Sequence, residues 1–117
     1  MLSITSALLI MAISMPLTPR ASLIEGQGIV ESGLNRFAVG KAGEKGIWQV
    51  QKRFWGEVPR DVSGQLKQHN RIMDSLMKAN NGNLEIAITR YNGRGKKAKA
   101  YYAKVRKKTI EVELIGV

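Results

Sequence analysis

The chain has 117 residues, enough for one domain with a modest hydrophobic core and too few for two. It contains no cysteine, which excludes disulfides and thiolate metal sites, and its one histidine, His69, argues against a histidine-built metal site. We therefore expect no metal site, and we also expect no cofactor. The net charge of +10 predicts an anionic partner, which could be nucleic acid, a membrane surface or an acidic polymer such as cell wall.

Residues 1–15 are strongly apolar and carry no charged side chain. Their length suits the hydrophobic region of an export signal and is short for a membrane span. Ala12 and Ser14 provide the small residues of a cleavage site, whereas the basic segment that usually precedes such a region is missing. Two predictions stay open: an export signal or membrane anchor, or a buried first helix capped by Ser3 or Thr5.

The next segment predicts a helix over residues 19–32. Two prolines in "MPLTPR" (residues 15–20) break the chain, and Thr18 can cap a helix that starts at Pro19. Its apolar face follows the 3.6-residue period and includes a carboxylate: Leu23, Ile24, Gln27, Val30, Glu31 and Leu34. Gly26 and Gly28 weaken this helix, which indicates that another backbone packs closely there.

The remainder of the chain predicts a mainly α single domain of about four to five helices with an extended active-site loop. Residues 33–46 contain four glycines and no periodicity, which is typical of a loop. Asp61 or Ser63 can cap a helix that ends at "NNGN" (residues 80–83), and residues 84–91 form a shorter one. A last helix carries Ala98, Tyr101, Tyr102 and Val105 on one face, and the alternating tail "TIEVELI" (residues 109–115) predicts an edge strand.

Three polar residues interrupt apolar stretches: Glu31, Gln49 and Tyr91. Each has a purely structural explanation. Glu31 could be an exposed residue in the last helical turn, Gln49 a satisfied core amide, and Tyr91 a core residue with its hydroxyl at the rim. Taken one at a time, none of them indicates a function.

Together, their surroundings resemble a known family. The segments "VESGLNRFAV", "AGEKGIWQV" and "AITRYNGRG" are similar, in order and spacing, to the three signature segments of the lytic transglycosylase (SLT) domain of the lysozyme-like superfamily. The resemblance covers about residues 20–106. It implies a lysozyme-like catalytic domain over residues 16–117 that cleaves peptidoglycan.

The resemblance assigns roles to individual residues. Glu31 matches the family's single catalytic acid, and Tyr91 matches the tyrosine that hydrogen-bonds this glutamate. The positions that it places along the sugar-binding groove are Ser32, Gly46, Trp48, Gln49 and Asn92. Trp48 stands where methionine is common and would form a sugar-stacking wall, while Gly40 and Arg90 depart from the family's small or hydroxyl residues.

Glycosidic cleavage requires a carboxyl group that is protonated near neutral pH, and burial on an apolar helix face would raise the pKa of Glu31 accordingly. The family's route, as the resemblance implies, has this glutamate protonate the bond between N-acetylmuramic acid and N-acetylglucosamine and then deprotonate the sugar's 6-hydroxyl. The product is a 1,6-anhydro sugar. A muramidase-type hydrolase would need a second carboxylate instead, for which Glu44, Glu57 and Asp61 are candidates.

Residues 90–108 carry nine basic side chains and no acidic one. They either attract anionic peptidoglycan or form a solvated helix face. The charge is also compatible with a basic nucleic-acid-binding module or a non-catalytic wall-binding protein, although no nucleic-acid-binding motif is recognisable. We expect glycan strands as the partner, in the periplasm or cell envelope, or on a virion if the protein belongs to a phage lysis or entry system. His69 is expected to be a structural histidine.

Overall fold

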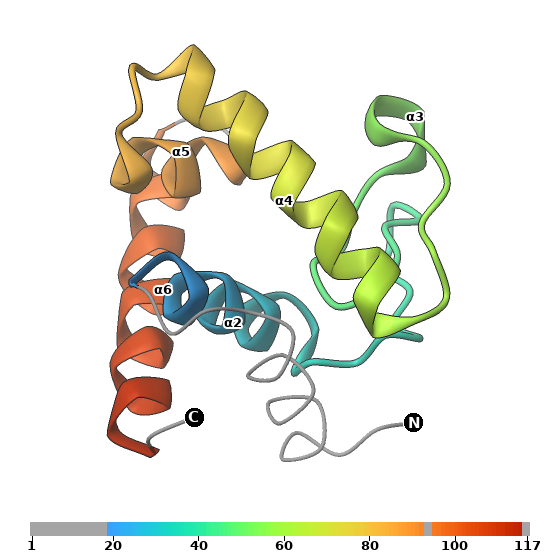
Figure 1. Cartoon of the computed structure of the whole chain (residues 1–117), viewed down its shortest axis with the longest axis horizontal. Coiled ribbons are helices and arrows are strands. Elements are labelled where there is room, and N and C mark those ends of the chain that lie inside the picture. The colour runs from blue at the N-terminus through green and yellow to red at the C-terminus, as the bar shows by residue number, and fades with distance from the viewer. Residues whose placement is uncertain (1–18, 93–94, 116–117) are drawn as a thin grey trace.

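The structure, a computed structural model, describes residues 19–92 and 95–115, and this part of the chain consists of five helices joined by loops (Figure 1). The helices are α2 (Pro19–Ser32), α3 (Lys52–Trp55), α4 (Val62–Ala79), α5 (Leu84–Tyr91) and α6 (Lys96–Ile115). The prediction of a mainly α domain with four to five helices is confirmed. The predictions for residues 1–15 and for the Thr18 cap lie outside the described residues.

Local signals place three of the helices. α2 has the bounds that its prolines and periodicity predict. The Asp61 carboxylate caps α4 by accepting a hydrogen bond from the Gly64 amide at 3.1 Å. The Asn83 side chain caps α5 in the same way, accepting from the Ile86 amide at 3.0 Å. The single-turn helix α3 carries no such signal and was not predicted.

The prediction of an edge strand at residues 109–115 is wrong, because this segment continues α6 to Ile115. Val105, Thr109 and Val112 are buried, and their spacing of four and three residues is that of one helix face. The Thr109 hydroxyl also donates to the Val105 carbonyl at 2.8 Å, a hydrogen bond within the helix. The helical period therefore prevails over the apparent alternation of apolar and polar residues.

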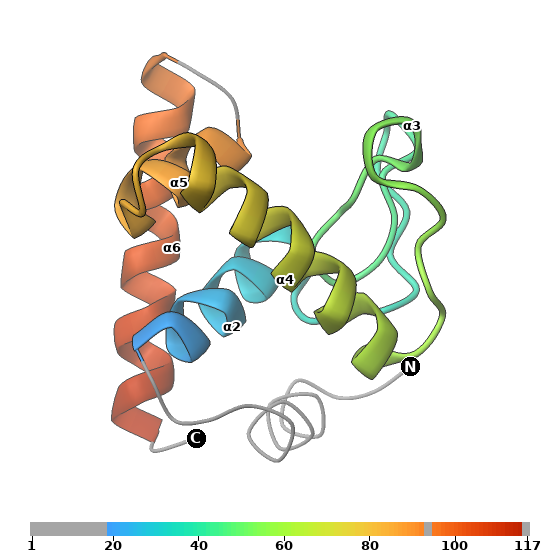
Figure 2. The same ribbon diagram turned by 45° about the horizontal axis from the view of Figure 1, so that its top comes forward.

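Figures 1 and 2 show α6 along one side of the molecule, with α2 running from it toward the loops, α4 running from α5 toward the loops, and α5 between α4 and α6. Gly26 explains how closely α2 meets α6. A Cβ atom at this position would lie 2.5 Å from Thr109 Oγ1 and 3.0 Å from the Val105 carbonyl oxygen. The prediction that another backbone packs at Gly26 is confirmed.

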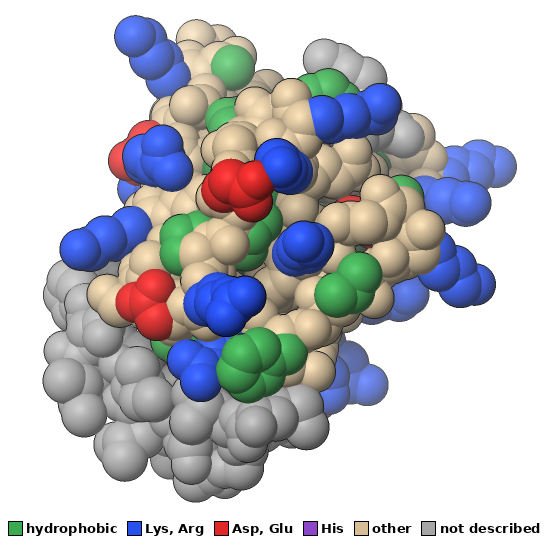
Figure 3. All heavy atoms as spheres, turned by 90° about the vertical axis from the view of Figure 1, so that its right-hand side faces the viewer, with side chains coloured by type: hydrophobic (Ala, Val, Ile, Leu, Met, Phe, Trp, Pro, Cys, Tyr) green, Lys and Arg blue, Asp and Glu red, His purple; other side chains and the backbone are tan. Residues whose placement is uncertain are grey.

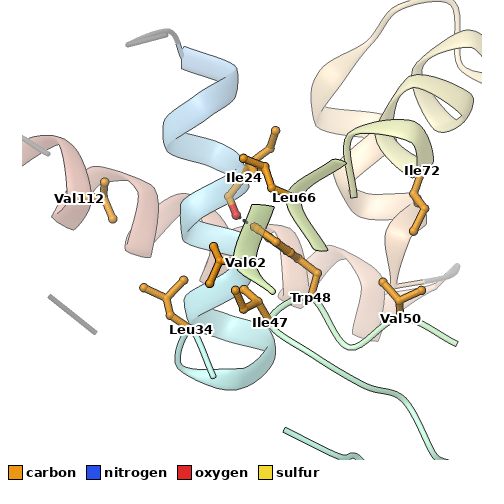
Figure 4. Close-up of a cluster of buried hydrophobic side chains, with 9 residues drawn as sticks. All are labelled: Ile24, Leu34, Ile47, Trp48, Val50, Val62, Leu66, Ile72 and Val112. Atoms are coloured by element: carbon orange, nitrogen blue, oxygen red, sulfur yellow. Dashed lines mark hydrogen bonds between the residues drawn. The ribbon is translucent and has the colours of Figure 1, made fainter. Parts of the chain in front are cut away.

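The main hydrophobic core brings the loop and three helices together (Figure 4). Trp48, from the loop before α3, lies at its centre, and its indole Nε1 donates to the Ile24 carbonyl at 2.8 Å. The other buried members are Ile24, Leu34, Ile47, Val50, Val62, Leu66, Ile72 and Val112. A second cluster joins α4, α5 and α6 through Met73, Ala87, Ile88, Tyr101 and Val105. Among residues 19–92 and 95–115, no helix combines the length and apolar character needed to cross a membrane.

Glu25 is a buried carboxylate on α2, and its Oε2 has no hydrogen-bond partner among the described residues. Burial raises the pKa of Glu25 from 4.5 to about 7. In the unfolded chain this group ionises first, so the wild type loses stability as pH rises from 4.5 through 7.

We therefore expect Glu25→Gln to match the wild type near pH 4 and to be more stable by roughly 1 to 3 kcal/mol above pH 7, since the amide never ionises. Urea unfolding at several pH values measures the difference. Glu113→Gln, at an exposed site, controls for the loss of one negative charge. A Glu25→Gln variant whose stability relative to wild type does not change with pH would contradict the prediction.

Candidate active site

Glu31 is the penultimate residue of α2, and its half-buried side chain lines a cavity of about 450 Å³. The cavity lies between the ends of α2 and α5 and one side of α6. Its remaining walls are formed by Val30, Asn92, Lys97, Ala100, Tyr101 and Lys104. The structure therefore brings together Glu31 and Asn92, two of the residues predicted from the sequence.

Burial raises the pKa of the Glu31 carboxyl from 4.5 to about 7. A hydrogen bond from the Tyr101 hydroxyl stabilises the carboxylate and limits this rise, and the nearby charge of Glu44 adds to it. At neutral pH a large share of the molecules consequently carry the proton. This is the protonation behaviour that a general acid requires.

The predicted hydrogen bond between Tyr91 and Glu31 is not the one that forms. The Tyr91 hydroxyl donates to the Trp48 carbonyl at 2.6 Å, and Tyr101 supplies the hydrogen bond to Glu31. Burial raises the pKa of the Tyr91 phenol, and the charge of Glu31 adds to this rise, which indicates that Tyr91 still lies close to Glu31. Sequence spacing missed Tyr101 because it belongs to the ordinary apolar stripe of α6.

Gln49 occupies a left-handed backbone conformation with φ of 51°. A non-glycine residue rarely adopts this region, and such strain is most often retained where a loop has a specific task. Its side-chain amide donates to the Gly46 carbonyl at 2.9 Å and, more weakly, to the Ala38 carbonyl at 3.4 Å. Gln49 lines a second cavity of about 450 Å³, which it shares with Tyr91, Arg90, Phe54 and Trp55.

Gly46 is buried with φ of 84°, and a Cβ atom there would lie 2.6 Å from Gln65 Oε1. Because glycine has no Cβ atom, the loop can pack directly on α4 at this position. Gln65, which sequence reasoning missed, accepts from the Ile47 amide at 2.8 Å and donates to the Arg36 and Pro59 carbonyls at 2.9 and 2.8 Å. A glutamine on the buried face of α4 was the only signal for this role.

Ser32 joins the end of α2 to the same loop. Its hydroxyl donates to the Ile47 carbonyl at 2.7 Å and accepts from the Asn35 amide at 3.0 Å. The predicted substrate contact would thus compete with hydrogen bonds that the protein makes to itself. In this structure Ser32 shapes the site by holding the loop.

The prediction that Trp48 forms a sugar-stacking wall is wrong, because this side chain is only 1% exposed. Its indole stacks on the His69 ring, with centroids 4.8 Å apart and an interplanar angle of 11°. The exposed aromatic residues beside the second cavity are Phe54 and Trp55, at 63% and 38%. Sequence reasoning did not assign them a role.

Glu44 is half-buried in the loop, and its Oε1 accepts from the Ala42 amide at 2.7 Å. A Cβ atom at Gly40 would lie 2.8 Å from Glu44 Oε2 and 2.6 Å from Gln49 Oε1, so a larger residue at position 40 would displace both side chains. The other candidate carboxylates have structural contacts: Glu57 pairs with Lys52, and Asp61 caps α4.

Positive charge surrounds the site. Lys97 and Lys104 line the Glu31 cavity, and α6 exposes further lysines along its length. Figure 3 shows lysine and arginine side chains spread over the face that carries the loops and α3, with hydrophobic side chains between them. Within the described part of the chain, no group of acidic and histidine side chains could hold a metal ion.

The Glu31 carboxyl is thus influenced by the Tyr101 hydroxyl and by the charge of Glu44, and its own charge acts on Tyr91. Tyr91 in turn lines the second cavity together with Gln49. Comparison of the chain with protein-family models, with curated proteins and with solved structures finds no match. What the site does is therefore inferred from its own residues and geometry.

Proposed function

We propose that this protein is a peptidoglycan lytic transglycosylase with a lysozyme-like domain, and that Glu31 is its general acid and base. One observation carries the proposal: an accessible carboxyl group lies in a cavity at the end of an apolar helix, with a pKa near 7. The three sequence segments that resemble the SLT family supply the substrate class.

In the proposed reaction, protonated Glu31 donates its proton to the glycosidic oxygen, and the bond from this oxygen to C1 of N-acetylmuramic acid breaks. The resulting Glu31 carboxylate accepts the proton of the muramic acid 6-hydroxyl while the oxygen of that hydroxyl bonds to C1. The 6-hydroxyl proton thus restores protonated Glu31, the first proton leaves on the hydroxyl of the departing sugar, and no water enters the products. A single carboxyl with a pKa near the working pH can serve both steps.

The surroundings of Glu31 suit this substrate. Lys97 and Lys104 line the cavity and would attract the carboxylates of muramic acid and its peptides. Asn92 provides an amide for the sugar's polar groups, and the exposed rings of Phe54 and Trp55 offer apolar faces on which further sugars could stack. The partner we propose is the glycan strand of the cell envelope.

Product analysis tests the proposal. We expect purified peptidoglycan, digested by the full-length protein in oxygen-18 water, to yield unlabelled 1,6-anhydromuramic acid ends in mass spectrometry. Glu44→Gln should retain most of the activity, because the ring closes without a second carboxylate. Absence of any glycan cleavage would overturn the proposal.

The second candidate function is hydrolysis by a muramidase-type enzyme of similar fold. One observation favours it: Glu44 lies close enough to Glu31 to raise its pKa through charge repulsion. Two carboxyl groups across a scissile bond are the arrangement that hydrolytic glycosidases use. Labelled reducing ends, together with an inactive Glu44→Gln variant, would select this function over the first.

A further inference from the structure

Three buried polar side chains connect the centre of the domain to Glu31. His69 Nε2 on α4 lies 2.9 Å from Gln27 Oε1 on α2, and Gln27 Nε2 lies 3.1 Å from the Tyr101 hydroxyl oxygen on α6. Tyr101 in turn lines the same cavity as Glu31, and its hydroxyl lies within hydrogen-bonding reach of the Glu31 carboxyl. We call His69, Gln27 and Tyr101 the buried hydrogen-bonded array. It spans three helices, and all three members are buried.

The hydrogen bonds of the array run in one direction. Because the Gln27 amide nitrogen donates to Tyr101, its carbonyl oxygen faces His69, and His69 must carry its proton on Nε2. The Tyr101 oxygen accepts from Gln27, which leaves its own hydrogen for the Glu31 carboxylate. Each donor thus meets one acceptor along the way from His69 to Glu31.

His69 is held neutral and fixed in orientation. Burial, together with the positive charge of Arg20, lowers its pKa from 6.5 to about 3, so the ring does not acquire a second proton near neutral pH. The Trp48 ring stacks on one face of His69, and Tyr91 meets it edge-on with centroids 5.1 Å apart. Its Nδ1 has no hydrogen-bond partner among the described residues, so Gln27 provides the hydrogen bond that orients the His69 ring.

Burying three polar side chains is costly, and apolar side chains of similar volume would fill the same space. A hydrogen-bonded array that ends on an accessible carboxyl can orient this carboxyl and stabilise its charge, which such apolar side chains could not do. The other groups that face Glu31 act differently: the charge of Glu44 raises the pKa of Glu31, Tyr91 donates its hydrogen bond to a backbone carbonyl, and Lys97 and Lys104 line the open side of the cavity.

We propose that His69, Gln27 and Tyr101 are positioning residues that hold the Glu31 carboxyl in one orientation and stabilise its ionised form. The inference rests on the proposed function, in which Glu31 gives up and takes back a proton. Tyr101 acts directly on the carboxyl, and Gln27 and His69 act through Tyr101. Stabilising the carboxylate limits the effect of burial, so that both forms of Glu31 are populated at neutral pH.

The first test replaces Tyr101 with phenylalanine and follows the Glu31 carboxyl by carbon-13 NMR titration of the full-length protein without substrate. Removing the hydroxyl removes a hydrogen bond to the carboxylate, so we expect the pKa of Glu31 to shift upward. Tyr102→Phe removes a hydroxyl from the neighbouring residue and should leave the titration unchanged. A Tyr101→Phe titration that coincides with the wild type would overturn the proposal.

The second test asks whether Gln27 acts through Tyr101. Gln27→Leu should also raise the pKa of Glu31, by less than Tyr101→Phe does, because Tyr101 becomes a weaker and less well oriented donor. In the Tyr101→Phe background the same substitution should have no further effect. Equal shifts in both backgrounds would mean that Gln27 acts only through packing, and the array would be overturned.

A measurement on the wild type keeps the proposal testable if a variant fails to fold. Nitrogen-15 NMR of the His69 ring should show a neutral ring protonated at Nε2 from about pH 5 to about pH 8, since the pKa of this ring lies near 3. Protonation at Nδ1 would reverse the direction of the array and overturn it. These titrations need no substrate, so the array can fail while lytic activity is present, and lytic activity can be absent while the array is intact.

Discussion

Glu31→Gln should lower the rate of glycan cleavage by about 10²- to 10⁴-fold, the usual contribution of a general acid or base. The amide has nearly the shape of the carboxylic acid, but it cannot donate a proton to the glycosidic oxygen. The release of soluble muropeptides from purified peptidoglycan measures the effect. Because the wild-type carboxyl is ionised above pH 7 at a cost in stability, the variant should unfold at the same or a higher temperature there.

The pH dependence adds a second expectation for the same residue. If protonated Glu31 starts the reaction, kcat/KM of the wild type should fall as pH rises above about 7, where the carboxyl loses its proton. Glu113→Gln, at an exposed site on α6, should keep the wild-type rate and profile. A Glu31→Gln protein that clears cell walls at nearly the wild-type rate would remove Glu31 from the mechanism.

Trp48→Ala should lower the free energy of unfolding by about 3–5 kcal/mol, the range for emptying a buried aromatic site. The substitution removes the centre of the main core, the stacking on His69 and the hydrogen bond to Ile24. Chemical denaturation followed by circular dichroism measures the loss, and Trp48→Phe, which retains one ring, should lose less.

Trp55→Ala is the matched control, since it removes the same side chain from a site that is 38% exposed. We expect a change in stability within about 1 kcal/mol and, if glycan strands lie along the second cavity, weaker binding to them. A Trp48→Ala protein of undiminished stability that no longer binds glycan would restore the sugar-wall interpretation and contradict the structure.

The fold could be predicted where local signals decide it. The proline at the start of α2, the aspartate at the start of α4 and the 3.6-residue period in α2, α4 and α5 predict these three helices, because capping and periodicity act within a few residues. The strand prediction for residues 109–115 failed because the apolar residues there fit both periods, and only packing against α2 selects the helix. That packing depends on residues about 80 positions apart, such as Gly26 and Thr109.

The site could be predicted in part for the same reason. The position of Glu31 on an apolar helix face is local, and burial does raise its pKa. Which tyrosine reaches it is not local: Tyr91 and Tyr101 both lie on helix faces that point inward, and the crossing of α2 with α6 gives the hydrogen bond to Tyr101. The Trp48 prediction failed similarly, since a motif position beside a groove glutamine does not reveal that the indole points into the core.

The close crossing of α2 and α6 at Gly26 separates two tasks, holding the acid and contacting the substrate, that enzymes often assign to the same loops. Glu31 and Tyr101 are positioned by two helices in direct contact, whereas Gln49, Phe54 and Trp55 belong to the irregular segment before α4 and to α3. On the proposed function, residues 51–58 could therefore change in length and sequence, and with them the preferred glycan, while the acid stays in place. An engineer who wishes to retarget the protein would randomise residues 51–58 and leave the helix crossing untouched.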